Sequence, residues 1–296
     1  MSTPGKKFRQ AISAQQPLMV VGAVNAYCAK MAEAAGHHAL YLSGAGVSNS
    51  SFGLPDLAIT TLNDVVEDAR RITNASELPL LVDIDTGFGG AFSIGRTIKE
   101  MISANVAAVH MEDQVAQKRC GHRPNKNLVD KIEMSDRIKA AVDGRTDENF
   151  FIMARTDSYA NEGMDGVIER CDEYVASGAD GLFLEAVASL EDYKLLKERL
   201  QVPVLANITE FGKTPLFTAE ELAGAGVDIM LFPLSAFRAM NKAAESVYRD
   251  IASSGTQHKS LDIMQTRDEL YEYLNYHSFE QKLDELFASK SNKGKE

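Results

Sequence analysis

The sequence predicts a (β/α)8 barrel of the TIM type, in the α/β class. Short apolar runs rich in Val, Ile and Leu recur at intervals of roughly 20 to 40 residues, and segments with helical spacing separate them. Apolar strands that alternate with amphipathic helices indicate parallel strands buried on both faces. Eight such units in 296 residues favour a closed barrel over an open doubly wound sheet, and no glycine-rich dinucleotide fingerprint follows the first run.

The predicted strands are the eight apolar runs. They span residues 18–24, 39–42, 80–84, 107–110, 150–154, 181–184, 202–206 and 229–232. Between them lie helical patterns such as Leu62, Val65, Val66, Ala69 and Ile72. Gly36, Gly178 and Gly226 are typical of helix ends that lead into the next strand.

Further helices are expected beyond the eighth strand. One covers about residues 237–251, and amphipathic runs follow around 265–271 and 276–287. We therefore expect one barrel domain over residues 1–296, with a helical extension over about 255–288 that packs on a neighbouring subunit. The polar residues 289–296 are expected to form a disordered tail.

Composition excludes several classes of function. A formal charge of −11 without a basic block argues against nucleic acid as a partner. No apolar stretch approaches the roughly 20 residues of a membrane span, and the N-terminal segment lacks a signal-peptide core, so we expect a soluble, cytoplasmic protein without a membrane partner. The three cysteines, at positions 28, 120 and 171, form no C-x-x-C pair and support neither a disulfide framework nor a zinc site.

Polar residues follow almost every predicted strand. In a barrel enzyme the chemistry lies at the carboxyl ends of the strands, so these side chains should share one mouth. They include Tyr41, Ser43, Asp83, Asp85, His110, Glu112, Arg155, Asp157, Glu185, Asn207, Thr209 and Arg238.

Two aspartates at the end of the third strand indicate a metal site. Asp83 and Asp85 are two residues apart and project to the same side of a regular strand. Two adjacent carboxylates need a cation, and the oxygen-only set with Glu112 favours Mg2+ or Mn2+ over zinc. The alternative is that these carboxylates cap the following helix.

The segment Lys118-Arg119-Cys120-Gly121-His122 surrounds one thiol with cationic groups. Nearby positive charge favours the thiolate, so Cys120 is a candidate acid, base or nucleophile. Gly121, Pro124 and Asn125 indicate a loop. The alternative is an incidental cysteine among solvated charges.

Other strand ends offer groups that bind a carboxylate. Ser43, Gly44 and Ala45 resemble an anion nest, although small residues are also common in turns. Arg155 and Arg238 can each grip a carboxylate bidentately, or form ordinary ion pairs. Asn207 and Thr209 alternate on one strand end, and Glu185 follows an apolar run where a carboxylate needs a partner.

These motifs together resemble the isocitrate lyase and phosphoenolpyruvate mutase superfamily over nearly the whole chain. The residues that carry the resemblance are 41–46 (YLSGAG), 53–56 (GLPD), 83–89 (DIDTGFG), 110–114 (HMEDQ), 118–122 (KRCGH), 154–157 (ARTD), 207–210 (NITE), 233–238 (PLSAFR) and 264–267 (MQTR). The resemblance implies a (β/α)8 barrel whose last helix is exchanged between the subunits of a homotetramer.

The resemblance also assigns roles to residues. It implies Mg2+ at Asp83 and Asp85, with Asp56 and Glu112 supporting it largely through water. The implied substrate-binding residues are Ser43, Gly44, Ala45, Cys120, Gly121, Arg155, Glu185, Asn207, Ile208, Thr209, Arg238 and Arg267. The implied catalytic residues are Tyr41, Lys118, Cys120 and His122.

Within the superfamily, Lys118-Arg119-Cys120 and the pocket residues Phe183, Leu231 and Pro233 resemble the branch that cleaves 2-methylisocitrate to pyruvate and succinate. That branch serves the methylcitrate cycle of propionate catabolism, with the cysteine as general acid. The alternatives are cleavage of isocitrate to glyoxylate and succinate, decarboxylation or hydrolysis of a 2-oxo acid, and a non-catalytic thiol sensor.

Overall fold

The computed structural model describes residues 2–121, 123 and 126–291. These residues belong to two compact units, Met1–Arg238 and Ala239–Glu296. The first unit carries the predicted barrel, and the second consists of helices.

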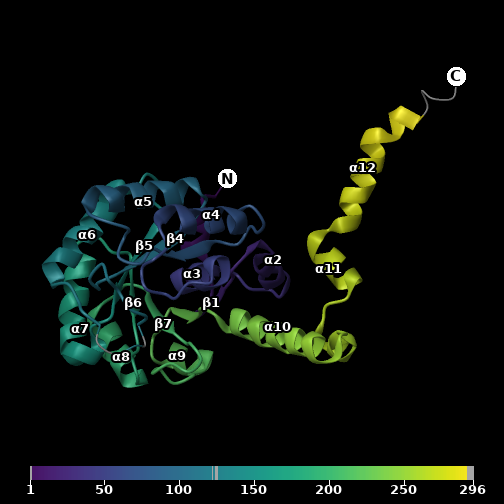
Figure 1. Ribbon diagram of the computed structural model, residues 1–296. Helices are drawn as coiled ribbons and strands as arrows, with labels where there is room; N and C mark the ends of the chain where they lie inside the picture. The colour runs from purple at the N-terminus through teal and green to yellow at the C-terminus, as the bar shows by residue number, and fades with distance from the viewer. Residues whose placement is uncertain (1, 122, 124–125, 292–296) are drawn as a thin grey trace. The chain divides into compact units, whose positions relative to one another are not determined.

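Eight parallel strands close into a barrel in sequence order, with β8 pairing back onto β1 (Figure 1). The strands are β1 (Leu18–Gly22), β2 (Leu40–Leu42), β3 (Leu80–Asp83), β4 (Ala108–Glu112), β5 (Phe151–Thr156), β6 (Gly181–Leu184), β7 (Val204–Asn207) and β8 (Ile229–Phe232). The predicted fold class is therefore confirmed, and every predicted strand exists. No strand end differs by more than two residues: β4 and β5 run two residues further at their carboxyl ends than hydropathy predicts, whereas β1 ends two residues earlier and β7 begins two residues later.

Helices surround the strands as an outer layer (Figure 1). They are α2 (Ala26–Ala34), α3 (Gly44–Phe52), α4 (Leu62–Thr73), α5 (Ala91–Ser103), α6 (Lys131–Gly144), α7 (Tyr159–Ala176), α8 (Leu190–Arg199) and α9 (Ala219–Gly224). In α4 the predicted apolar stripe is the buried face, from Leu62 to Ile72. This stripe packs in the core between the helices and the outer face of the sheet.

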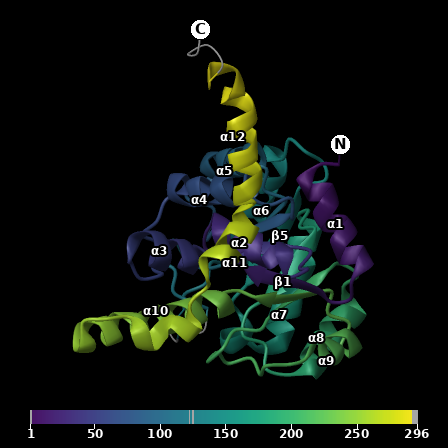
Figure 2. The ribbon, with the colours of Figure 1, turned by 90° about the vertical axis from the view of Figure 1, so that its right-hand side faces the viewer.

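A second core fills the interior of the barrel, and α1 (Pro4–Ala14) contributes to it. Phe8 of α1 is fully buried and meets Phe151 at the start of β5 edge to face, with ring centroids 5.5 Å apart. Leu18 at the start of β1 lies in the same cluster. Helix α1 therefore packs at the end of the barrel where the strands begin (Figure 2).

Alternate residues of each strand continue this interior row toward the opposite end. In β5 the row runs from Phe151 and Met153, which are in the interior core, to Arg155. In β4 the same alternation leads from Ala108 through His110 to Glu112. Because side chains two residues apart share one side of a strand, the barrel interior changes from apolar to charged along its axis.

The second unit contains most of α10 (Ser235–Ser254), then the 3-10 helix η1 (His258–Ile263), α11 (Arg267–Leu274) and α12 (Tyr276–Ser291). Helices α10, α11 and α12 correspond to the three helical runs predicted beyond the eighth strand, whereas η1 was not predicted. Residues 289–291 of the predicted tail belong to α12, and residues 292–296 lie outside the described part. No helix among the described residues has the length and apolar character needed to cross a membrane.

Candidate active site

A cavity of about 300 Å³ opens at the carboxyl ends of the strands. Most of the predicted site residues line it, namely Tyr41, Ser43, Ala45, Asp56, Asp83, Lys118, Cys120, Gly121, Arg155, Glu185, Asn207, Thr209 and Arg238. The prediction that these strand ends meet at one mouth is thus met by the geometry. The cavity is mixed in character, because Phe183, Pro233 and Leu234 also contribute.

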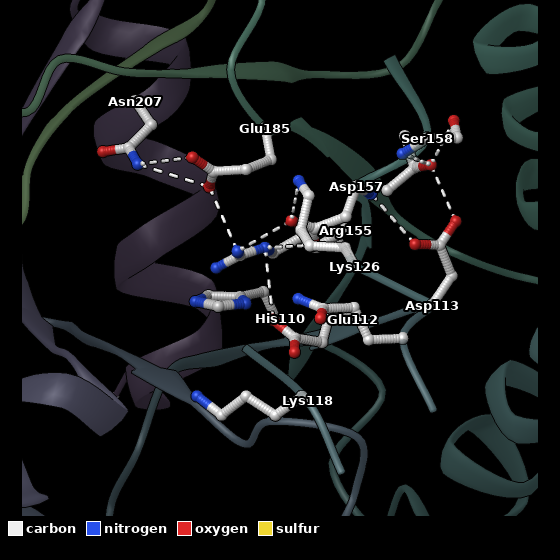
Figure 3. A network of polar contacts seen from close by, with 12 residues as sticks. His110, Glu112, Asp113, Lys118, Lys126, Arg155, Asp157, Ser158, Glu185 and Asn207 are labelled. Carbon is white, nitrogen blue, oxygen red and sulfur yellow. Dashed lines mark hydrogen bonds and ion pairs between the residues drawn. The ribbon is translucent and has the colours of Figure 1, made fainter. Parts of the chain in front are cut away.

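Arg155 is the centre of the charged network in this cavity (Figure 3). Its Nε lies 2.9 Å from Asp157 Oδ2 and 3.4 Å from Glu112 Oε2, and its Nη2 lies 3.2 Å from Glu185 Oε2. The guanidinium also stacks over the Phe183 ring, 5.0 Å from its centroid. Register explains one contact, because β4–β5 pairing places Glu112 directly beside Arg155.

These contacts leave one nitrogen of Arg155 for a ligand. Three carboxylates hold Nε and Nη2, whereas Nη1 makes no hydrogen bond or ion pair with a described residue. Burial opposes the charge, but the neighbouring carboxylates outweigh it and raise the pKa of Arg155 well above its usual value. Arg155 is therefore a permanent, fixed cation suited to binding a carboxylate.

The segment that carries the thiol lies against this arginine. A Cβ at Gly121 would lie 2.4 Å from Nη2 of Arg155 and 2.5 Å from Cγ of Glu185, so only glycine fits. Cys120, next in the chain, is exposed and lines the cavity, whereas Cys28 and Cys171 are buried.

The two aspartates of the predicted metal site lie together beside α3. Asp83 accepts a hydrogen bond from the Gly44 backbone N–H at 3.1 Å, and its other oxygen accepts from the Asp85 N–H at 3.0 Å. A Cβ at Gly44 would be within 3.2 Å of oxygens of both carboxylates. Glycine thus permits this approach, while Ala45 lies inside α3, where its helical backbone suits alanine.

Lys118 reaches the same carboxylates from the thiol-bearing segment. Its ammonium contacts Asp56 and lies 2.7 Å from Asp85, and its side chain is almost fully buried. Desolvation acts to lower its pKa, but the surrounding carboxylates, Asp85 first, raise it above the usual value. Lys118 is therefore positively charged at every physiological pH.

Burial and the closeness of these charged groups shift the pKa values of the carboxylates. Burial and then the charge of Asp83 raise the pKa of Asp85 to about 6. Burial also raises the pKa of Glu112 well above its usual value, although Arg155 opposes this. For Asp83, burial is outweighed by His110, Lys118 and Arg155, and its pKa is lowered.

This donor set fits a magnesium ion that keeps some of its water. The donors are carboxylate oxygens, and Glu112 Oε1 is buried without a hydrogen bond from any described residue. No group of three His, Cys, Asp or Glu side chains within the described part could hold a metal on its own. Mg2+ commonly binds through one or two carboxylates and several waters, and a divalent cation would relieve the crowded negative charge.

Tyr41 and His110 form a buried pair next to Asp83. The Tyr41 hydroxyl and His110 Nε2 are 2.8 Å apart, and His110 is also packed against Phe183. Burial lowers the pKa of His110 to about 4, although Asp83 opposes this. Burial and the charge of Asp83 raise the pKa of Tyr41 well above its usual value. At neutral pH both groups are uncharged.

Of three further predicted site residues, only Ile208 can be placed relative to the cavity, and it is not among the residues that line it. Ile208 packs in the core outside the sheet, and its N–H donates to the Leu231 carbonyl. Arg267 begins α11 in the second unit. His122 lies outside the described residues. Their roles remain predictions, as do those of the residues that line the cavity.

The structure gives contacts to residues for which the sequence predicted no specific role. Asp157 and Lys126 form a buried ion pair behind Arg155, 2.8 Å apart. Glu210 and Phe211 follow β7 and line the mouth near Arg238. Asp157 stands in the Arg-Thr-Asp motif and was detectable there, but no pattern in the sequence points to Lys126.

Known proteins resemble the chain over nearly its whole length. Residues 8–252 match the phosphoenolpyruvate phosphomutase family. The chain belongs to this family. It is 61% identical to a 2-methylisocitrate lyase of Vibrio cholerae over 98% of this chain and 96% of that protein. The chain is accordingly an enzyme, a lyase of the phosphoenolpyruvate mutase and isocitrate lyase superfamily.

Solved structures show the same architecture. A 2,3-dimethylmalate lyase, described as a member of this superfamily, is 33% identical with a TM-score of 0.88, covering 97% of this chain and 96% of that one. A phosphonopyruvate hydrolase solved in complex with oxalate and Mg2+ is 25% identical with a TM-score of 0.83, covering 97% and 98%.

Proposed function

We propose that this lyase cleaves 2-methylisocitrate to pyruvate and succinate, with Mg2+ as cofactor and Cys120 as the general acid, in the methylcitrate cycle. The observation that carries the proposal is that Gly121 packs on Arg155 and Glu185 while the neighbouring Cys120 lines the same cavity as this cation, which is suited to a substrate carboxylate. The names of relatives 57–61% identical support the choice of substrate.

Cleavage of the substrate requires three things. The hydroxyl group must lose its proton, and the carbon that bears this hydroxyl must become the keto carbon of pyruvate. The electron pair of the broken carbon–carbon bond must be protonated to give succinate. Mg2+ bound near Asp83 and Asp85 supplies Lewis-acid stabilisation of charge on the hydroxyl and keto oxygens. The remaining work belongs to side chains of the chain itself.

Arg155 binds a substrate carboxylate through Nη1, and its three acidic partners keep it from moving. Lys118 and Arg238 add positive charge on the side where the succinate fragment develops. Asn207 donates to Glu185 at 3.3 Å, which orients the two polar groups at the ends of β6 and β7.

The proton acceptor is best assigned to a carboxylate. Tyr41 is a poor source of phenolate, because burial and Asp83 raise its pKa well above the usual value. Glu112 is buried, and its Oε1 accepts no hydrogen bond within the described part. We therefore assign the acceptor role to a carboxylate of the metal site and a positioning role to Tyr41.

Product analysis tests this function. The protein is incubated with Mg2+ and either 2-methylisocitrate or isocitrate, and pyruvate is measured against glyoxylate. We expect pyruvate and succinate from 2-methylisocitrate at the higher kcat/KM. Preferential glyoxylate release would assign the chain to isocitrate cleavage, and no Mg2+-dependent turnover would support a non-catalytic role.

Cys120→Ser tests the acid separately. The hydroxyl has a far higher pKa than the thiol at nearly the same size, so turnover should fall by a factor on the order of 10² or more while binding is retained. Substrate binding is measured by protection of the protein in a thermal shift assay. Turnover near that of the unsubstituted protein would remove Cys120 from the acid role.

We also propose that the protein is a homo-oligomer, a tetramer as the superfamily resemblance implies. An apolar groove lies outside β1 and β8, lined by residues that include Met19, Val21 and Phe232. In the second unit, α12 exposes Phe279, Leu283 and Leu286 at helical spacing. Apolar surfaces of this kind mark interfaces between chains.

A further inference from the structure

One buried carboxylate joins the substrate-binding arginine to the segment that carries the thiol. Asp157 is fully buried, and its Oδ1 accepts from Lys126 Nζ at 2.8 Å and from Arg155 Nη2 at 3.2 Å. Its Oδ2 accepts from Arg155 Nε at 2.9 Å, and its own backbone N–H donates to Asp113 at 2.9 Å (Figure 3). Asp157 is thus held by Asp113, which directly follows β4, and it pairs with two cations.

Lys126 follows the thiol-bearing segment, residues 118–122, in the part of the chain that leads on to α6. Its side chain is only 3% exposed, and its carbonyl accepts from Asn161 in α7 at 3.3 Å. A desolvated ammonium is costly unless an anion meets it, and replacing such a pair with apolar groups is often neutral for stability. Stability alone therefore does not explain a lysine at this position.

Hydrogen bonds also hold the part of the chain that leads from β4 into this segment. Gln114 is fully buried, and its amide donates to the Arg119 carbonyl at 2.9 Å while accepting from the Arg119 N–H at 3.0 Å. A bridge between Gln114 and Leu128 closes the base of the segment, and Val115 donates to the Asn127 carbonyl at 3.0 Å. Among residues 114–121, 123 and 126–128, only Lys126 is connected to Arg155 through ion pairs. The connection runs through Asp157, which pairs with both residues.

We propose that Lys126 and Asp157 are positioning residues that set the Cys120 segment relative to Arg155. This inference rests on the proposed function and deepens it. Asp157 holds the guanidinium that grips the substrate carboxylate, and through Lys126 it holds the chain that presents the acid. Asp157 therefore positions both the chain that carries the acid and the cation that binds the carboxylate.

Steady-state kinetics test the proposal, because loss of Lys126 should affect mainly kcat, whereas loss of the Asp157 carboxylate should affect both kcat and KM. In Lys126→Met, Asp157 still pairs with Arg155, so we expect kcat to fall by about tenfold or more with KM for 2-methylisocitrate within about threefold. Lys126→Arg should recover most of this loss. In Asp157→Asn, Lys126 loses its ion-pair partner and Arg155 loses one of its three carboxylate partners, so KM should rise and kcat should fall.

The matched control is Lys131→Met, which removes a partly exposed ion pair with Glu169, 3.2 Å long, at the start of α6. Its kcat should stay within about twofold of the unsubstituted protein, as expected for a surface pair. A melting temperature is measured for each variant. A kcat unchanged in Lys126→Met, or lost in step with melting temperature alone, would overturn the proposal.

A second readout does not depend on turnover. Cys120 is exposed while Cys28 and Cys171 are buried, so alkylation by iodoacetamide followed by peptide mass spectrometry reports on Cys120. We expect its rate to change by about threefold or more in Lys126→Met and not in Lys131→Met. If the unsubstituted protein fails to cleave 2-methylisocitrate, the proposed function falls, but a changed alkylation rate would still support the positioning role. An unchanged rate would overturn that role.

Discussion

At the scale of single residues, the site depends on how closely Gly121 approaches Arg155. We expect Gly121→Ala to reduce kcat/KM by about 10²-fold or more, because the added Cβ would displace Arg155 or Glu185 by an ångström or more. Gly224→Ala is the control, since a Cβ there meets no atom within 4 Å. Steady-state kinetics and melting temperature are measured for both. Normal activity in Gly121→Ala would show that this approach is not required in solution.

His110 gives the second prediction at this scale, in the dependence of stability on pH. Its pKa is about 4 in the folded protein, because burial disfavours the charged ring, against 6.5 when it is unburied. Between these values the unfolded chain binds more protons, so stability falls as pH falls from 6.5 toward 4. At pH 5 the loss is roughly 2 kcal/mol.

The variant His110→Gln removes this titration while keeping a group that can hydrogen-bond to Tyr41. Urea unfolding followed by circular dichroism at pH 7.5 and pH 5 should show a smaller pH-dependent loss in the variant, by about 2 kcal/mol. Equal losses in the two proteins would mean that His110 is not held neutral by burial. Both are measured at one protein concentration, so that association does not enter the comparison.

Sequence patterns identified most of the cavity residues but not the contacts among them. Asp83 and Asp85 were predictable because they end an apolar strand two residues apart. Lys126 was not, because it joins Asp157 across 31 positions of sequence and follows no apolar run. Such pairing depends on the closure of the barrel, which a local pattern does not encode.

At the scale of elements, hydropathy located every strand but missed the charged ends of β4 and β5. The apolar signal stops at His110 and Ala154, while the strands run to Glu112 and Thr156. Charged side chains inside a barrel are tolerated only when they are paired, and Glu112 and Arg155 pair across the two strands. Hydropathy therefore ends the predicted strand where the active site begins.

The packing of α5 on α6 gives a prediction at this scale. A Cβ at Gly144 would lie 2.6 Å from the Gly95 Cα, where backbone leaves no room, so Gly144→Ala should destabilise the protein by about 1–3 kcal/mol. Gly95→Ala is the matched control, because its Cβ would lie 3.6 Å from the Ala140 carbonyl oxygen, an ordinary contact. The prediction is tested by the melting temperatures of the two variants, each compared with that of the unsubstituted protein. Equal melting temperatures would show that α5 and α6 can separate without cost.

At the scale of the whole molecule, the chain keeps apolar surface that one copy leaves exposed. Met19 on β1 is 41% exposed in a groove bounded by apolar side chains. In the second unit, Phe279 is 71% exposed and Leu286 is 61% exposed on α12. A monomer with a formal charge of −11 would remain dispersed despite these surfaces, so their presence favours specific association over aggregation.

We therefore expect a homo-oligomer in which both surfaces are covered. Met19→Glu, and separately the double variant Phe279→Glu with Leu286→Glu, should shift the mass measured by light scattering after size-exclusion chromatography toward the monomer, because each buries a charge in an apolar contact. Ile132→Glu is the control, since Ile132 is 69% exposed on α6 and belongs to neither surface. Each variant is compared over a range of protein concentrations, because a weakened oligomer dissociates first on dilution. A mass that stays unchanged in both test variants, or falls equally in the control, would mean that neither surface forms the interface.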